Sequence, residues 1–170
     1  MRFRRTMPAP GGRDLPEEVA HPRPIVFDWT VGPDSLSETV AHVNNVTYLH
    51  WVDRVAELAG EALGHTREQL AAEGRMWFVA RHELDYLAEA FEGDRVLAAT
   101  WIRDARKTSC RRETLMWIDR SGGARPIAHA LSTWTWIDLE RRRPCRMPEH
   151  ITRLLDPLVD HPEVVEGERP

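Results

Sequence analysis

Apolar side chains recur with two different periods along this chain, and the change of period separates a helical part from a strand-rich part. Between about Asn45 and Leu63, apolar positions recur every three or four residues, as they do on one face of an α-helix. This stripe consists of Tyr48, Leu49, Val52, Val55, Ala56, Ala59 and Leu63. From Met76 onwards the period changes to two, which is typical of strands. The pattern therefore predicts one long helix followed by a series of strands.

The expected elements follow one another in a simple order. A strand at residues 24–31 precedes the long helix, and a short helix at residues 66–73 follows it. The later elements are strands at 76–86, 95–104, 110–119 and 124–139 and a short closing helix at 149–156. Consecutive strands joined by short turns favour an antiparallel sheet, and the broad apolar face of the helix needs such a sheet to cover it. The sequence predicts an α+β fold in which a curved antiparallel sheet of about five strands wraps around a long central helix.

Composition indicates a single globular domain. The 170 residues are 42% hydrophobic and 29% charged, and no apolar run approaches the roughly 20 residues needed to cross a bilayer. We expect the domain at residues 23–157, between a flexible N-terminal tail, residues 1–22, and a loose C-terminal tail, residues 158–170. A net charge of −4 without a basic stripe argues against nucleic acid as a partner. The two cysteines have no metal-site spacing and form no disulfide framework, so we expect no metal and a cytoplasmic protein. Because no long apolar run is present, we also expect no membrane association.

The segment just before the long helix contains the candidate chemistry. It reads His42-Val43-Asn44-Asn45, with Glu38 four positions before His42 and Tyr48 three positions after Asn45. Asn44 and Asn45 suit a helix start, because a short amide side chain accepts hydrogen bonds from exposed backbone N–H groups. Further along the chain lie Asp85-Tyr86-Leu87, Phe91-Glu92-Gly93-Asp94 and Lys107-Thr108-Ser109.

Together these segments resemble the signature of the hotdog thioesterases, the family of 4-hydroxybenzoyl-CoA thioesterase and the plant acyl-ACP thioesterases. The resemblance spans residues 24–155 without a large gap. It implies a hotdog fold and hydrolysis of an acyl-CoA or acyl-carrier-protein thioester to a free acid and a thiol. It implies no separate cofactor, since CoA is part of the substrate. It also implies a homodimer or homotetramer whose sites lie at the subunit boundary.

The resemblance assigns roles to three residues of the motif. Attack on a thioester carbonyl builds negative charge on its oxygen, and the N–H groups of a helix N-terminus can hold that charge. We expect this role for N–H groups near Asn45, with its side chain as a helper. Glu38 would act as general base toward water or as nucleophile. The family usually has Asp at this position, and the extra methylene of Glu displaces the carboxylate by more than about 1 Å. The base role is favoured because a base that acts through water tolerates this displacement better than a direct nucleophile does.

Other residues have an expected role together with an alternative. His42 would orient the carboxylate, bind the carbonyl or act as an acid, and Asp34 is an alternative carboxylate. Asn44 and Tyr48 would contact the substrate, although Asn44 also suits a helix cap and Tyr48 the core. Phosphates attract guanidinium, ammonium and hydroxyl donors. The turn Arg106, Lys107, Thr108 and Ser109 is therefore expected to bind the nucleotide end of CoA, unless it is a solvated turn.

Two other functions remain open at this point. One is a hydratase or dehydratase on the same fold. The other is a non-catalytic protein that binds acyl thioesters, which the replacement of Asp by Glu38 keeps in consideration.

Overall fold

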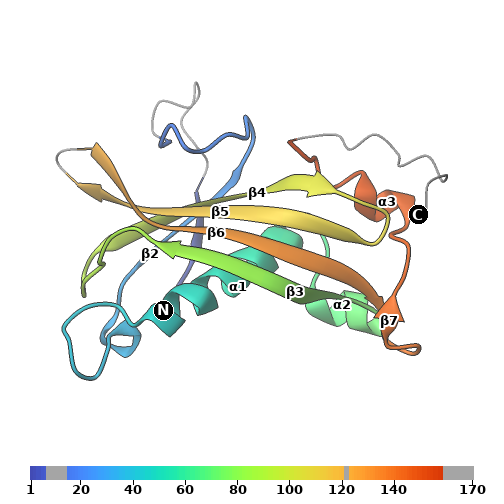
Figure 1. The fold of residues 1–170 in the computed structure, drawn as a ribbon, viewed down its shortest axis with the longest axis horizontal. Helices are drawn as coiled ribbons and strands as arrows, with labels where there is room; N and C mark the ends of the chain where they lie inside the picture. The colour runs from blue at the N-terminus through green and yellow to red at the C-terminus, as the bar shows by residue number, and fades with distance from the viewer. Residues whose placement is uncertain (7–14, 121–122, 159–170) are drawn as a thin grey trace, which may run out of the picture.

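One long helix lies across a face of a twisted antiparallel sheet (Figure 1). The computed structural model describes residues 1–6, 15–120 and 123–158. The helices are α1 (Asn45–Ala62), α2 (Arg67–Ala72) and α3 (Glu149–Thr152), with a 3₁₀ turn η1 (Pro33–Ser35). The strands are β1 (Arg4–Thr6), β2 (Ile25–Thr30), β3 (Arg75–Tyr86), β4 (Arg95–Ala105), β5 (Ser109–Arg120), β6 (Gly123–Asp138) and β7 (Arg143–Pro144).

The strands form one sheet in the order β1-β2-β4-β5-β6-β3, and β7 pairs with the end of β6. All neighbouring strands are antiparallel. Register shifts interrupt β3 between Val79 and Arg81, β4 between Ile102 and Asp104, and β5 between Met116 and Trp117. Such bulges bend a strand and increase its twist, which lets the sheet curve around α1. Among the described strands, β3 pairs only with β6, so its other edge is free.

The core lies between α1 and the sheet. Trp51, Val52, Val55 and Ala59 of α1 are almost fully buried against residues of β2, β4, β5 and β6. These four positions belong to the stripe that the sequence predicts or lie directly beside it. A second apolar cluster fills the space between the C-terminal half of α1, α2, α3 and the sheet. The predicted fold, a curved antiparallel sheet around a long helix, is therefore confirmed.

The sheet has more strands than the sequence predicts, because short segments pair at both ends of the chain. Arg4–Thr6 falls within the expected N-terminal tail, yet it pairs with β2 in the register Arg4↔Asp28 and Thr6↔Val26. Asp28 accounts for this pairing, since it accepts hydrogen bonds from the side chains of both Arg4 and Thr6. Nearly all of the expected C-terminal tail, residues 159–170, lies outside the described residues.

The face of the sheet opposite α1 is partly covered as well. Leu15 and Val19 pack on a third apolar cluster that includes Trp101 and Trp117. In the part of the chain that the structure describes, no helix has the length and apolar character needed to span a membrane.

Candidate active site

A cavity opens at the first turn of α1. It holds about 440 Å³ of empty space, counting the part open to solvent. Its lining consists of His42, Val43, Asn45, Tyr48, Tyr86, Leu87, Ala88 and Glu89. These residues come from only two parts of the chain, the entry to α1 and the exit from β3.

Backbone hydrogen bonds hold these two segments together. The Val43 N–H donates to the Ala90 carbonyl at 2.8 Å, and this bond ties the entry to α1 to the segment after β3. The Asn44 N–H donates to the Ser35 carbonyl at 2.9 Å, and a β-bridge joins Leu36 to Val43. The loop between η1 and α1 is therefore closed at its base, so the position of His42 is fixed from both sides.

The first turn of α1 borders the cavity through Asn45. The Asn44 side chain accepts from the Val46 N–H at 2.9 Å, and the Thr47 N–H donates to the Asn44 carbonyl. The Asn45 N–H has no acceptor among the described residues, and Asn45 lines the cavity. Tyr86 donates from its hydroxyl to the Asn45 carbonyl at 3.1 Å and so supports this turn from β3. An N–H group in this position, at the positive end of the helix dipole, is suited to hold a developing oxyanion.

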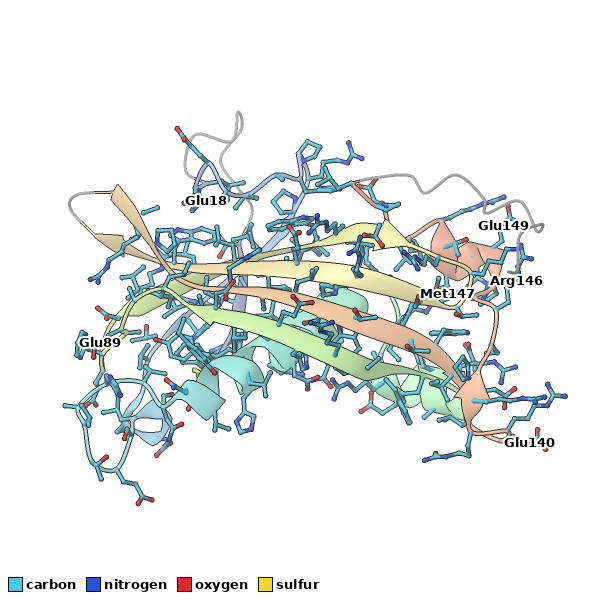
Figure 2. The ribbon with its side chains drawn as sticks, in the orientation of Figure 1. Glu18, Glu89, Glu140, Arg146, Met147 and Glu149 are labelled. Atoms are coloured by element: carbon cyan, nitrogen blue, oxygen red, sulfur yellow. The ribbon has the colours of Figure 1, made fainter. Side chains whose placement is uncertain are left out.

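His42 and Glu89 form a pair at the rim of the cavity. The His42 Nδ1 lies 2.8 Å from a carboxylate oxygen of Glu89, and the two side chains are 29% and 62% exposed. Glu89 lies beside the loop that leads into α1, at the opposite end of the sheet from Met147 and Glu149 (Figure 2). Glu89 was not among the expected site residues. Its place between two segments of the family resemblance is a signal, but an isolated Glu carries no pattern of its own.

The other expected site residues lie in three different environments. Glu38 is exposed on the loop before α1 and does not line the cavity, and Asp34 is likewise exposed in η1. Asn44 caps the helix and lies outside the lining. Tyr48 lines the cavity, and burial raises the pKa of its phenol, so the hydroxyl stays protonated. The structure thus brings His42, Asn45 and Tyr48 together and leaves Glu38 and Asn44 outside.

The turn of residues 106–109 lies at the other end of the sheet. The Trp136 N–H donates to the Thr108 carbonyl, and Ser109 pairs with Thr135, which in turn pairs with Phe78 near the start of β3. The first turn of α1 instead contacts Tyr86, at the end of β3. Within one chain, therefore, the expected nucleotide-binding turn and the cavity are not adjacent.

No group of three or more His, Cys, Asp or Glu residues in the described ranges is placed to hold a metal ion. Burial raises the pKa of the Cys110 thiol to about 12, so a reactive thiolate does not form there near neutral pH.

The overall fold matches those of several solved thioesterase structures. A 1,4-dihydroxy-2-naphthoyl-CoA thioesterase from Synechocystis is 17% identical, with a TM-score of 0.71 over 78% of this chain and 96% of that one. A protein from Staphylococcus aureus, solved in complex with CoA, is 15% identical, with a TM-score of 0.72 over 87% and 95%. A probable thioesterase from Bartonella henselae is 19% identical, with a TM-score of 0.66 over 74% and 99%. At these identities the likeness establishes the hotdog fold.

The family of the chain follows from comparison of its sequence with family models. No curated protein matches this sequence. Residues 35–155, however, match the family model described as the thioesterase-like superfamily, and this range contains the whole cavity as well as α1 and strands β3 to β7. The chain therefore belongs to the thioesterase-like superfamily.

Proposed function

We propose that this protein hydrolyses an acyl-CoA thioester to a free acid and CoA. One observation carries the proposal: the Asn45 N–H, which has no acceptor among the described residues, and the His42–Glu89 pair belong to the same cavity at the start of α1. Hydrolysis needs both parts, an electrostatic cradle for the carbonyl oxygen and a group that takes a proton from water. Membership of the thioesterase-like superfamily and the CoA bound to the Staphylococcus aureus protein support the choice of substrate.

The proposed reaction starts with water as the nucleophile. Because Nδ1 of His42 is paired with Glu89, Nε2 is the ring nitrogen left to accept a proton from water. The water oxygen bonds to the carbonyl carbon, and the negative charge that builds on the carbonyl oxygen is stabilised by the Asn45 N–H. The C–S bond then breaks, and the proton held by His42 passes to the leaving thiolate. In this scheme Glu89 is a positioning residue, because it acts through His42.

Glu38 stays the alternative base, as the family resemblance implies. Its exposed position outside the cavity lining favours the His42–Glu89 pair. A thioester carbonyl held by the Asn45 N–H lies within the cavity, and a base must come within hydrogen-bond reach of the attacking water.

We further propose that the working form is a homodimer paired through β3. The free edge of β3 exposes Phe78 and Val79 at 41% and 37%, and an uncovered apolar edge favours pairing with another strand. Antiparallel pairing of two β3 strands about a two-fold axis sets the Arg75 end of one beside the Tyr86 end of the other. The partner's β4–β5 turn then approaches the α1 start of the first chain. Its Arg106 and Lys107 would contact the CoA phosphates, with Thr108 and Ser109 as further donors.

A free-thiol release assay over short, long and aromatic acyl-CoAs tests the function. We expect turnover by the wild type, a fall in kcat of about 100-fold or more in His42→Gln, and a change of less than about threefold in Glu38→Gln. A larger loss in Glu38→Gln than in His42→Gln would transfer the base role to Glu38. Tight acyl-CoA binding with no thiol release from any substrate would show instead a non-catalytic binding protein.

A further inference from the structure

A second cavity lies at the opposite end of α1. It is bounded by the C-terminal half of α1, α2, α3 and the adjoining ends of β3, β5 and β6, which gather at one end of the molecule (Figure 1). The empty space measures about 720 Å³, counting the part open to solvent. Most of the wall is apolar, with Leu63, Leu70, Trp77, Trp134, Leu154 and Leu155 as its main contributors. It shares no lining residue with the cavity at the α1 start.

One buried cation lines this apolar cavity. Arg112 is 9% exposed and faces α1 from β5. One of its terminal nitrogens donates to the Thr100 hydroxyl at 3.2 Å. No carboxylate of the described residues forms an ion pair with it. Burial lowers the pKa of the guanidinium. A guanidinium has five N–H donors, so most of its capacity is unused.

The neighbouring arginines show that this lack of a partner is exceptional. Arg111, next to it on β5, pairs with Asp104, and Arg103 on β4 pairs with Glu113 at 3.0 Å. Within the cavity wall, Arg67 pairs with Asp53 at 3.0 Å and lies 3.5 Å from Glu57. A buried charge without a counter-ion is strongly unfavourable, and buried charges are normally paired. The position of Arg112 is therefore suited to a negative group that enters from outside the chain.

A second unused donor belongs to the same cavity wall. The indole N–H of Trp134 is buried and has no acceptor in the described structure. One guanidinium and one indole N–H within apolar walls suit a group with a single negative charge and two acceptor oxygens. Arg67 also lines the cavity, but its guanidinium is engaged by Asp53 and Glu57, so Arg112 is the cation left for a ligand, and one free cation suits a carboxylate better than a phosphate group. The apolar wall requires that the rest of the ligand be hydrocarbon.

From these features we propose that the cavity between α1, α2 and α3 binds an apolar carboxylic acid whose carboxylate is held by Arg112. The hydrocarbon part of the ligand lies against Leu70, Trp77 and Leu155. The carboxylate completes an ion pair that the chain by itself leaves open. This site does not depend on thioester hydrolysis, because binding can be measured without turnover.

Calorimetric titration of the full-length protein with octanoate and with octan-1-ol tests the site. The two probes share a chain length and differ in the carboxylate. We expect octanoate to bind roughly tenfold or more tightly than octan-1-ol, the factor that one charge-assisted hydrogen bond typically contributes. Equal affinities, or no binding of octanoate at millimolar concentration, would overturn the proposal.

Substitutions in the cavity wall show where octanoate binds. Arg112→Met keeps much of the side-chain length and removes the charge, so the preference for octanoate over octan-1-ol should fall to about one. Arg112→Lys should retain a preference. Arg153→Met is the matched control, because Arg153 directly follows α3 beside the cavity, has an exposed side chain and does not line the cavity. Leu154→Trp, which fills the cavity, should abolish octanoate binding whether or not Arg112→Met folds. Unchanged preference in Arg112→Met, or unchanged binding in Leu154→Trp, would contradict the assignment.

The carboxylate that Arg112 holds has two alternative sources: a free carboxylic acid, or the far end of a dicarboxylic acyl group. Hydrolysis of decanedioyl-CoA and decanoyl-CoA by the wild type and Arg112→Met separates them, and this comparison alone rests on the proposed function. A dicarboxylic source predicts that kcat/KM for decanedioyl-CoA falls about tenfold in the variant while that for decanoyl-CoA is unchanged. A free-acid source predicts the same kcat/KM for both esters in wild type and variant. Both results uphold the site once octanoate has been shown to bind.

Discussion

His42 and Glu89 are 47 positions apart in the chain, yet the His42 Nδ1 lies 2.8 Å from a Glu89 carboxylate oxygen. The contact depends on the neighbouring bond from the Val43 N–H to the Ala90 carbonyl, which joins the entry to α1 to the segment after β3. The site is therefore assembled by one junction between two loops, and a change on either loop is expected to alter its chemistry.

Replacing Glu89 should impair catalysis through His42. In Glu89→Gln the amide no longer supplies a negative charge to the imidazole, so its orientation and its ability to hold a proton weaken. We expect kcat to fall about tenfold. A larger fall is not expected, because Glu89 is well exposed and solvent partly screens its charge. The pH dependence of kcat should change as well. Steady-state thiol release measures both, with Glu92→Gln, an exposed carboxylate three positions away, as control. A normal pH profile in Glu89→Gln would exclude the positioning role.

Asn44→Ala should destabilise the protein and disturb the site together. The side chain caps α1 by accepting from the Val46 N–H, and loss of such a cap costs about 0.5–2 kcal/mol of unfolding free energy. Because the same turn presents the Asn45 N–H, we also expect lower kcat. Urea unfolding measures the first effect and thiol release the second. Asn44→Ser, which can still cap the helix, should recover most of the stability. If Ala and Ser are equally destabilising, the cap is not the cause.

Asp28 should make the protein sensitive to acid. Burial by itself would raise the pKa of this carboxyl, but hydrogen bonds from Thr6 and Arg95 and the charges of Arg95 and Arg4 leave it below its ordinary value of 3.8. The unfolded chain then binds more protons than the folded one as the pH falls below about 4, and stability decreases until the folded-state pKa is passed.

The variant Asp28→Asn tests whether Asp28 causes this loss of stability at low pH. At pH 7 it should be about 2 kcal/mol less stable than wild type, since hydrogen bonds to a charged group are lost. The difference should shrink as the pH is lowered from 5 to 2.5, because only the wild type loses this contribution. Chemical denaturation at several pH values provides the measurement, with the exposed Asp119→Asn as control. Parallel curves for wild type and Asp28→Asn would refute the linkage.

Val79→Glu should dissociate the proposed dimer. Val79 lies at the centre of the free edge of β3, and two inward-facing carboxylates across a two-fold axis repel each other. Light scattering after size exclusion should show a dimer for wild type and a monomer for the variant, with hydrolysis reduced in parallel. Leu158→Glu is the matched control, since Leu158 is similarly exposed at 36% and bonds to β4 rather than β3. A monomeric wild type with full activity would argue against a site shared between subunits.

The sequence by itself determined the architecture, because α1 and the strands are built from periodic apolar positions. Tyr48, Val52 and Val55 of α1 are buried along the period that the sequence shows, and strand alternation is readable in the same way. The start of α1 was also readable, since Asn44 caps a helix through a contact within two positions. Local rules suffice for features of this kind.

Only the tertiary structure decided which side chains meet. Glu89 joins His42, and Arg112 lines a largely apolar cavity without forming an ion pair with a carboxylate of the described residues, because of packing between segments far apart in the chain. Neither residue has a periodic or local signature. Glu38 has the better sequence signature and yet lies outside the cavity lining. It belongs to the loop that the Leu36–Val43 bridge closes, and there its side chain is exposed to solvent. Periodicity specifies which face of an element is buried, whereas the partner of a charged group depends on how the elements pack.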